Sequence, residues 1–562
     1  MSIVNNPPIS KCLNCILVSI FLEVSSIPQS RENDYDCALE SRSLSAISEV
    51  CRSWRSLVLA LPTLWAKTMD VDSQSLARFR ISMERSRPAH IHVYSSLPIL
   101  DSNPERIAVW QIVVDNFARC ATFHVEGAYA AGADMDERPI QRLLESSAPA
   151  LRSLSLRGLG WYFDSATSTR GCSDLARCSL NCLTIEPLSD LQSITTLIID
   201  NSSDHTPHRY GRNTSEHWLG VLGQLPNLST LHLIDAVYVP SFMPVHRCSD
   251  CCTLPLEGLQ DFRLVGNALV NAHLLHALDI PQACNISINL KAYDSPRLIN
   301  AIDPLVDSAE VCRTWVDHAL HLSFQRIHLH CESVVPFSQL DIQIKRRGFR
   351  ITLSNETSLC RFEFSYLNNL EHNGTMEFLL NRALIRLADG RTSPVSKLAL
   401  TTRGSDSYTP AVFTNLHRLL SRLPSVVHLF LGGDSVRSLV FEVLRHSMHP
   451  YQQADAGGQG FSDSTPVLPS LVAVFINGSA LTSRTTWGIF QTYLTWRLEQ
   501  QCHIENLYIL TGGNRELGDA VYAAVTELPD TLQICIGIAH DLYSISMDEL
   551  DGRSQWKAGT DR

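Results

Sequence analysis

The sequence predicts an α/β protein in which a short all-α module precedes an irregular α/β solenoid with a parallel sheet. A proline-led phrase with alternating aliphatic residues recurs along the chain, and amphipathic helical stretches separate its copies. Near the N-terminus, apolar residues instead recur at helical spacing. The expected segments are a module at 8–66, a connecting segment with first capping units at 67–140, the solenoid at 141–550 and a frayed tail at 551–562.

Composition narrows the class of protein. The 562 residues are too many for one compact core, and 44% hydrophobic with 18% charged residues is typical of globular proteins. A net charge of −11 argues against a nucleic-acid partner, since that binding depends on neutralising phosphates. The 17 scattered cysteines favour reduced thiols in the cytoplasm or nucleus. No run reaches the ~18–20 apolar residues of a membrane span, so no membrane association is expected.

The N-terminal stretch predicts two or three short helices. The first stripe lies between Leu13 and Phe21, and a second runs at helical spacing from Ile47 to Leu61 as one helix. Pro62 should end the second helix, because proline disfavours a helical conformation in the residue before it. A module of about 60 residues buries little apolar surface, so it should be only marginally stable by itself. The module is therefore either a cap packed on the larger domain or an adaptor module completed by a partner.

Three motifs carry a family resemblance. P-I-S-K-x-x-N-x-I-L-x-x-I-F (8–21), V-C-x-x-W-R (50–55) and L-P-x-L-W (61–65) resemble the F-box-like domain. The resemblance is in particular to the version of this domain found at the N-terminus of fungal F-box proteins with leucine-rich-repeat-like C-terminal regions. The family usually has Leu-Pro-x-Glu where this chain has Cys12, Leu13, Asn14 and Cys15. The resemblance implies docking on the Skp-type adaptor of a cullin–RING ubiquitin ligase, with the 25–43 segment as a loop.

The resemblance and the stripes together nominate one set of residues, without separating the module's internal core from its docking surface. These residues are Leu13, Ile16, Leu17, Ile20, Phe21, Val50, Trp54, Leu57, Leu61, Leu64 and Trp65.

The repeated phrase begins at four prolines and ends in an alternating pattern that predicts a short strand with one buried face. The copies start at Pro149, Pro226, Pro424 and Pro469, and looser echoes start at Leu259, Phe324, Leu359, Val395 and Ile504. Helices are expected at 215–225, 267–278, 410–423, 435–448 and 484–501. Strand, loop and helix units that cannot bury their own apolar faces predict a right-handed solenoid.

The units depart from regular leucine-rich repeats, which are shorter and carry Asn or Cys after the strand. Asn267 occupies that position after one echo, but the main phrases lack the residue. We therefore expect an irregular, gently curved horseshoe with long loops at 205–214 and 452–465. A series of doubly wound α/β domains is the structural alternative. The segment 70–100 predicts a helix and then a strand, and 101–123 a further helix-containing unit.

Chemical motifs are sparse. The sequence lacks the nucleophile-elbow, zincin, P-loop and dinucleotide-binding patterns, so no enzyme activity and no cofactor are expected. HRCSDCC (246–252) is the best metal candidate, but it lacks a second Cys-x-x-Cys, so no metal is expected. The pairs His273/His276 and His318/His321 are interpreted as surface residues. The aromatic residues of 487–494 are interpreted as core.

Together these features predict a substrate-recognition subunit of an SCF-type ubiquitin ligase. Its partners would be the Skp-type adaptor, through it the cullin–RING ligase, and an unknown target protein. The alternative is a repeat scaffold whose degenerate F-box no longer couples to ubiquitination. A secreted repeat protein is a weaker interpretation, because the apolar segment 12–24 lacks a small-x-small cleavage site.

Overall fold

The structure is a computed structural model of the chain. It describes residues 14–25, 46–67, 69–72, 74–95, 103–126, 147–157, 162–163, 174–180, 184–185, 192–202, 214–237, 253–281, 283–292, 317, 320–321, 324–325, 337–345, 347–355, 361–368, 373–389, 395–403, 409–432, 443, 448, 467–477, 484–510 and 532–537.

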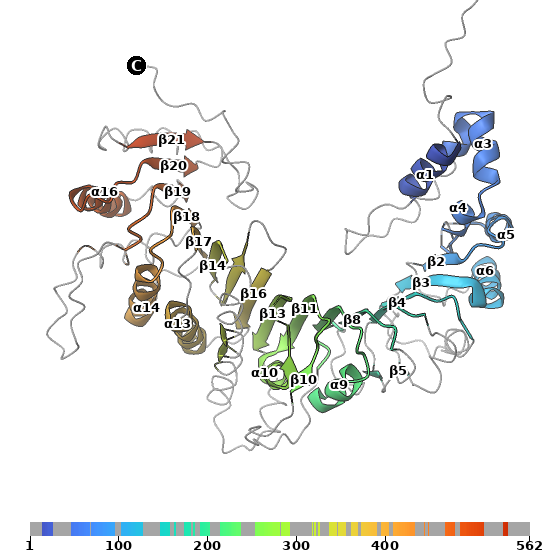
Figure 1. Ribbon diagram of the computed structural model, residues 1–562, viewed down its shortest axis with the longest axis horizontal. Coiled ribbons are helices and arrows are strands. Elements are labelled where there is room, and N and C mark those ends of the chain that lie inside the picture. The colour runs from blue at the N-terminus through green and yellow to red at the C-terminus, as the bar shows by residue number, and fades with distance from the viewer. Residues whose placement is uncertain are drawn as a thin grey trace, which may run out of the picture. The chain divides into compact units, whose positions relative to one another are not determined.

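The chain is a mixed α/β protein with mostly parallel sheet, as predicted, and it forms two compact units. The first unit comprises Met1–Tyr238 with Leu256–Leu259, and the second comprises Val239–Pro255 with Gln260–Arg562. Figure 1 shows the helices and strands of both units.

The first unit begins with short helices. These are α1 (Asn14–Ser25), a helix at 46–50, α3 (Arg52–Leu59) and α4 (Pro62–Ala66). The prediction of one continuous helix across Ile47–Leu61 is wrong, because Cys51 has extended backbone (φ −159°, ψ 169°) and caps α3. In one helix Ile47 and Val58 would stand ~16 Å apart along the axis. The break lets both enter the same small core.

The sheet of the first unit is parallel and follows chain order. Its strands pair as β1–β2–β3–β4–β6–β8–β9. Their bounds are β1 Met69–Asp70, β2 Ile91–Ser95, β3 Cys120–Glu126, β4 Ser153–Arg157, β6 Arg177–Leu180, β8 Thr196–Asp200 and β9 Thr230–Ile234, and β5 (Tyr162–Phe163) pairs separately with β7 (Thr184–Ile185).

Three helices and a 3-10 turn accompany this sheet. They are α5 (Leu76–Arg85), α6 (Pro104–Asp115), η2 (Phe117–Arg119) and α9 (Ser215–Leu222). The helix and strand expected in 70–100 are α5 and β2, and the unit expected in 101–123 contains α6 and β3. Both predictions are confirmed.

The second unit has a longer sheet with order β11–β13–β16–β15–β14–β17–β18–β19–β20–β21. The strands are β11 Asp261–Asn267, β13 Asn285–Ala292, β14 Gln339–Lys345, β15 Gly348–Ser354, β16 Arg361–Asn368, β17 Lys397–Arg403, β18 His428–Gly432, β19 Ala473–Asn477, β20 Asn506–Leu510 and β21 Gln533–Gly537, with β10 (Leu254–Pro255) paired to β12 (Leu278–Asp279). The helices are α10 Ala268–Ala277, α13 Asn373–Asp389, α14 Pro410–Ser421 and α16 Arg484–Glu499. In Figure 1, α13 and α14 lie side by side, and Asn415 Nδ2 donates to Asn381 Oδ1 across them at 3.0 Å.

The strands β14, β15 and β16 depart from the expected all-parallel order. Among the described strands of the second unit, β15 alone runs antiparallel to both neighbours, and the order of the three is reversed in the sheet. Gly348 allows the close approach of β15 to β16, because a Cβ there would collide with the carbonyl oxygen of Tyr366. The succession of parallel strands in the second unit is therefore interrupted by a three-stranded meander.

All four proline-led phrases form the predicted strands, namely β4, β9, β18 and β19. A hydrogen bond closes a turn ahead of each of these strands. The donor is the backbone N–H of the second residue after the proline, and the acceptor is the carbonyl oxygen of the residue before the proline. The bonds are Leu151 to Ala148 (3.0 Å), Leu228 to Leu225 (3.3 Å), Val426 to Leu423 (3.4 Å) and Leu471 to Leu468 (3.1 Å). The three aliphatic positions that define the phrase are buried in every copy, so the phrase encodes one local structure.

A second feature recurs at the beginning of several strands. The carbonyl oxygen just before a strand accepts from two consecutive backbone N–H groups of the next strand segment. Arg152 O accepts from Ala176 and Arg177 (3.0 and 2.9 Å), Thr195 O from Ser229 and Thr230 (2.8 and 2.9 Å), and Val427 O from Val472 and Ala473 (2.9 and 3.0 Å). The same connection therefore repeats in both units.

Most of the weaker expectations are also confirmed. The echoes at Leu259, Leu359, Val395 and Ile504 lead into β11, β16, β17 and β20, and four predicted helices correspond to α9, α10, α14 and α16. The strand expected from the echo at Phe324 is wrong for its first residues, because Phe324 and Gln325 are helical. There the ring of Phe324 packs near Phe362 and Phe364, at 6.1 and 6.4 Å between centroids. Most of the 435–448 helix and the two expected long loops lie outside the described residues.

Acid should destabilise the first unit through His92 on β2. The pKa of His92 is lowered from 6.5 to about 4, first by burial and then by the charges of Lys67 and His90. The unfolded state therefore takes up the proton first, and stability present above pH ~6.5 is lost as the pH falls towards 4. We expect His92 to account for about 2 kcal/mol of the loss in unfolding free energy between pH 7 and 5. Urea titrations at both pH values measure this loss.

His92→Gln should remove most of this difference, and His503→Gln, at an exposed position, is the matched control. An unchanged pH dependence in His92→Gln would show that the wild-type imidazole is not held neutral.

Candidate protein-docking site

The N-terminal helices enclose a small core of their own, called here the module core. Its buried residues are Leu17, Phe21, Ile47, Val58 and Leu64, and Leu22, Trp54, Leu57, Leu61 and Trp65 pack against it. The core joins residues separated in sequence by the 26–45 segment, which brings α1 onto α3 and α4.

Two tryptophans fix the helices of this module. The rings of Phe21 and Trp54 meet edge to face, with 4.9 Å between centroids. Trp65 Nε1 donates to the carbonyl oxygen of Val58 at 3.0 Å, which folds α4 back on α3 as the sequence predicts. The guanidinium of Arg85 lies 4.7 Å from the centroid of the Trp65 ring and links the module to α5. Both tryptophans are only half-buried.

One face of α1 stays outside the module core. Leu17 and Phe21 point inward, whereas Ile16 and Ile20 are 48% and 41% exposed. Residues four apart share a helix face, so the two isoleucines form an outward apolar stripe beside the buried one. A helix with apolar residues on both its buried and its outward side is expected where a second surface covers it.

The following helices add two more exposed apolar residues. Val50 is 59% exposed, and Leu59 on α3 is 42% exposed. Four of the eight large apolar side chains that stand exposed in the described residues therefore belong to this short module. Single exposed apolar residues need no explanation, but a local concentration indicates an interaction surface.

The structure sorts the predicted site residues into three groups. The exposed group consists of Ile16, Ile20 and Val50. The group buried in the module core consists of Leu17, Phe21 and Leu64, and the group half-buried against that core consists of Trp54, Leu57, Leu61 and Trp65. Leu13 lies outside the described residues. Leu59 was missed. The available signal was its position four residues after Arg55, which puts an apolar residue on the same helix face as a charged one.

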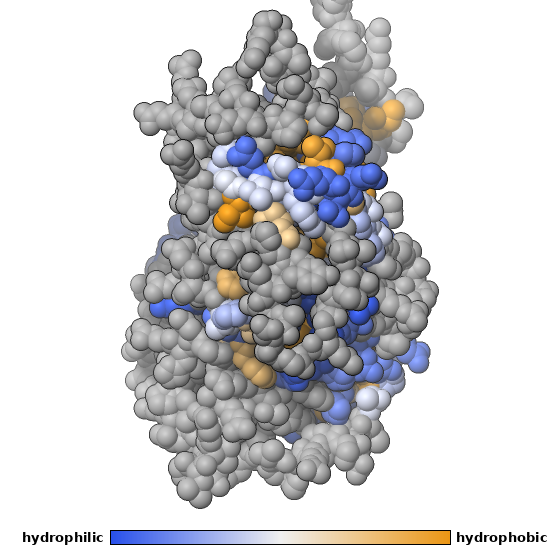
Figure 2. All heavy atoms as spheres, turned by 90° about the vertical axis from the view of Figure 1, so that its left-hand side faces the viewer, coloured by the Kyte–Doolittle hydropathy of each residue, from blue (hydrophilic) through white to orange (hydrophobic). Residues whose placement is uncertain are grey.

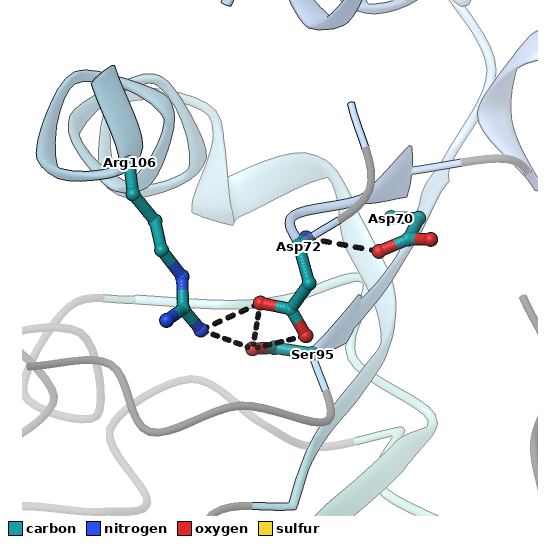
Figure 3. A network of polar contacts seen from close by, with 4 residues as sticks. All are labelled: Asp70, Asp72, Ser95 and Arg106. Atoms are coloured by element: carbon teal, nitrogen blue, oxygen red, sulfur yellow. Dashed lines mark hydrogen bonds and ion pairs between the residues drawn. The ribbon is translucent and has the colours of Figure 1, made fainter. Parts of the chain in front are cut away.

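Apolar residues where the module meets the sheet are buried. Ala66, Met69 and Val71 are at most 2% exposed. Next to them, Asp72 accepts hydrogen bonds from Ser95 Oγ (3.0 and 3.2 Å) and from Arg106 Nη2 (2.5 Å), as Figure 3 shows. This network ties α6 to the carboxyl ends of β1 and β2. Its core is an ion pair between Arg106 and Asp72, whose side chains are 7% and 9% exposed.

The second unit contains a separate aromatic row on its sheet. The rings of Phe430, Phe475 and Tyr508 stack across β18, β19 and β20, with 4.3 Å between successive centroids. The cluster around this row consists of strand residues only. Phe430 and Phe475 are 8% and 6% exposed, and Tyr508 is half-buried, so the two phenylalanines offer little surface.

The remaining aromatic residues singled out in the sequence are core. Trp218 is fully buried, and its Nε1 donates to the carbonyl oxygen of Ala236 at 3.1 Å. Trp487, Phe490 and Tyr493 are buried on α16. Figure 2 views the side on which α16 lies, and its described surface is mainly hydrophilic with a few small, separate apolar patches. The described part of this side therefore lacks the apolar concentration of the N-terminal module.

Charged clusters in the second unit are structural pairs. Burial would raise the pKa of Asp317, but hydrogen bonds from Arg382 (2.8 and 3.1 Å) and Arg386 (3.0 Å) hold it below its ordinary value. Arg386 also contacts Nδ1 of His321 at 2.7 Å. Burial raises the pKa of Asp341, which accepts from Gln343 Nε2 at 2.9 Å.

Within the described residues, no group of His, Cys, Asp or Glu is arranged to hold a metal ion, and the 246–252 motif lies outside them. Five cysteines of the described part of the chain form no disulfide bond, namely Cys51, Cys120, Cys178, Cys284 and Cys502.

Among the helices that the structure describes, none combines the length and apolarity needed to cross a membrane. No protein-family model matches the sequence, and no curated protein shows significant similarity to it.

Proposed function

We propose that the protein is the substrate-recognition subunit of an SCF-type ubiquitin ligase, acting in the cytoplasm or nucleus. The N-terminal helices form an F-box-like module that binds a Skp-type adaptor, and through it a cullin–RING ligase. The strand-repeat units bind a target protein. One observation carries the proposal: a small helical module with its own core exposes Ile16, Ile20, Val50 and Leu59.

The recurring turn and the recurring bifurcated carbonyl support the second half of the proposal. They indicate a leucine-rich-repeat-like solenoid that is irregular where β14–β16 interrupt it. Repeat stacks present extended surfaces suited to binding proteins. The protein itself would make no covalent bond. Binding two partners at once would raise the effective concentration of target lysines near the ubiquitin-charged conjugating enzyme.

The proposal predicts that Ile20→Lys weakens binding to a purified Skp-type adaptor by roughly 10–100-fold, because a buried apolar interface contact is replaced by a charge. Leu367→Lys on β16 is the matched control, since Leu367 is 39% exposed and lies outside the module. Titration calorimetry measures both dissociation constants. Circular dichroism checks that the two variants remain folded.

Equal affinities of Ile20→Lys and Leu367→Lys would remove Ile20 from the interface. No binding by the wild-type chain would favour the alternative function, a repeat scaffold not coupled to ubiquitination. The departure from Leu-Pro-x-Glu at Cys12–Cys15 is the feature that keeps this alternative open.

A further inference from the structure

The outer face of α5 is basic in a chain whose net charge is −11. Between Leu76 and Arg87 the sequence holds four arginines and one acidic residue, and all five side chains are exposed: Arg78, Arg80, Arg85, Arg87 and Glu84. Six exposed arginines lie in residues 46–95, because α3 adds Arg52 and Arg55. Over the same stretch the exposed acidic residues are Glu49 and Glu84.

An apolar side chain lies among these charges. Phe79 and Met83 bury the inner face of α5, whereas Ile81 is 46% exposed. At ~100° per residue Ile81 points away from the buried side, with Arg85 and Arg78 on one flank and Glu84 followed by Arg80 on the other. The outer face of α5 therefore combines an apolar centre with a rim of three arginines and one glutamate, and an apolar centre with a polar rim is how protein interfaces are commonly arranged.

Three of these arginines keep their charge available within the described part of the chain. Arg80 and Arg87 make no ion pair with the residues that the structure describes, and Arg85 stacks on Trp65 without losing its charge. Burial and then the charge of Arg87 lower the pKa of nearby Arg119.

We propose that the outer face of α5 is a docking surface for an acidic segment of another protein, in which carboxylates flank an apolar side chain. The basic rim is complementary to such a segment, and Ile81 would contact its apolar residue. The apolar centre and the acidic chain favour a protein over a nucleic acid. This inference goes beyond the proposed function and does not depend on binding of the adaptor.

The test uses the full-length protein and fluorescence anisotropy. The probe is a short labelled peptide that alternates paired glutamates with single leucines. Its comparators are the same peptide with glutamine for glutamate, and a single-stranded RNA of equal length. The variants are Arg80→Glu and Ile81→Ser. Arg422→Glu, an exposed arginine that caps α14, is the matched control for the change in charge.

The proposal predicts that the glutamate peptide binds the wild type at least tenfold more tightly than the glutamine peptide. Arg80→Glu should weaken binding of the glutamate peptide roughly tenfold, and Ile81→Ser should weaken it several-fold. Arg422→Glu should bind the peptide as tightly as the wild type does. Added salt should weaken peptide binding by every one of these proteins. The proposal would be overturned if the glutamate peptide failed to bind, or if Arg422→Glu lost as much affinity for it as Arg80→Glu. Tighter binding of the RNA than of the glutamate peptide would also overturn it. The affinity of the same variants for the Skp-type adaptor is measured in parallel. This second measurement tests the proposed function independently of peptide binding.

Discussion

Replacing Arg497 with alanine is expected to lower the free energy of unfolding of the second unit by about 3–5 kcal/mol. Arg497 is 1% exposed on α16 and donates to the carbonyl oxygens of Val467 (2.9 Å), Leu468 (3.0 Å) and Cys502 (3.0 Å). It also contacts Tyr493 Oη at 3.2 Å. Alanine would leave these acceptors buried without a donor and would create a cavity. Urea titration followed by tryptophan fluorescence measures the loss.

Two further variants separate the guanidinium from the packing. Arg497→Lys keeps the charge but not the five-donor fork, so it should recover only part of the loss. Tyr493→Phe removes one acceptor and should cost about 1 kcal/mol. Wild-type stability in Arg497→Ala would mean that this arginine does not hold the turn before β19 to the end of α16.

The second large effect is expected at Arg106 in the first unit. Arg106→Leu should cost about 3–5 kcal/mol, because it leaves the Asp72 carboxylate buried without its cation. The two side chains are 7% and 9% exposed, and their ion pair is part of the network in Figure 3. Thermal unfolding followed by circular dichroism measures the effect.

The double variant distinguishes a lost ion pair from lost packing. Adding Asp72→Asn to Arg106→Leu removes the uncompensated charge, so the double variant should be more stable than Arg106→Leu alone. Additive losses would contradict the ion-pair explanation. A larger loss in the double variant would also contradict it, and would assign the effect to the hydrogen bonds between Asp72 and Ser95.

Much of the sheet could be predicted because one local phrase encodes one local structure. A proline, a buried aliphatic residue and an alternating end suffice to specify the turn and strand at β4, β9, β18 and β19. The β14–β16 meander was not predicted, although a signal existed. Two alternating runs, QLDIQIK and GFRITLS, are separated by two residues, which is typical of an antiparallel pair.

The candidate site was predictable as a set of residues but not as a surface. Helical periodicity identifies apolar stripes, yet it cannot tell Leu17 from Ile16, because α1 is apolar on both sides. The break at Cys51 was also hidden, since cysteine is not among the residues preferred at helix N-caps. Which stripe α1 buries depends on contacts with Val58 and Leu64, which are distant in sequence.

The central claim is that the outward apolar face of the N-terminal module is covered by a second polypeptide. Hydrogen exchange of the full-length chain, with and without a purified Skp-type adaptor, tests it most directly. The account predicts slower exchange in peptides covering 14–25 and 46–66 when the adaptor is present, and little change in those covering β17–β20. Unchanged exchange in both N-terminal segments at saturating adaptor would contradict the claim.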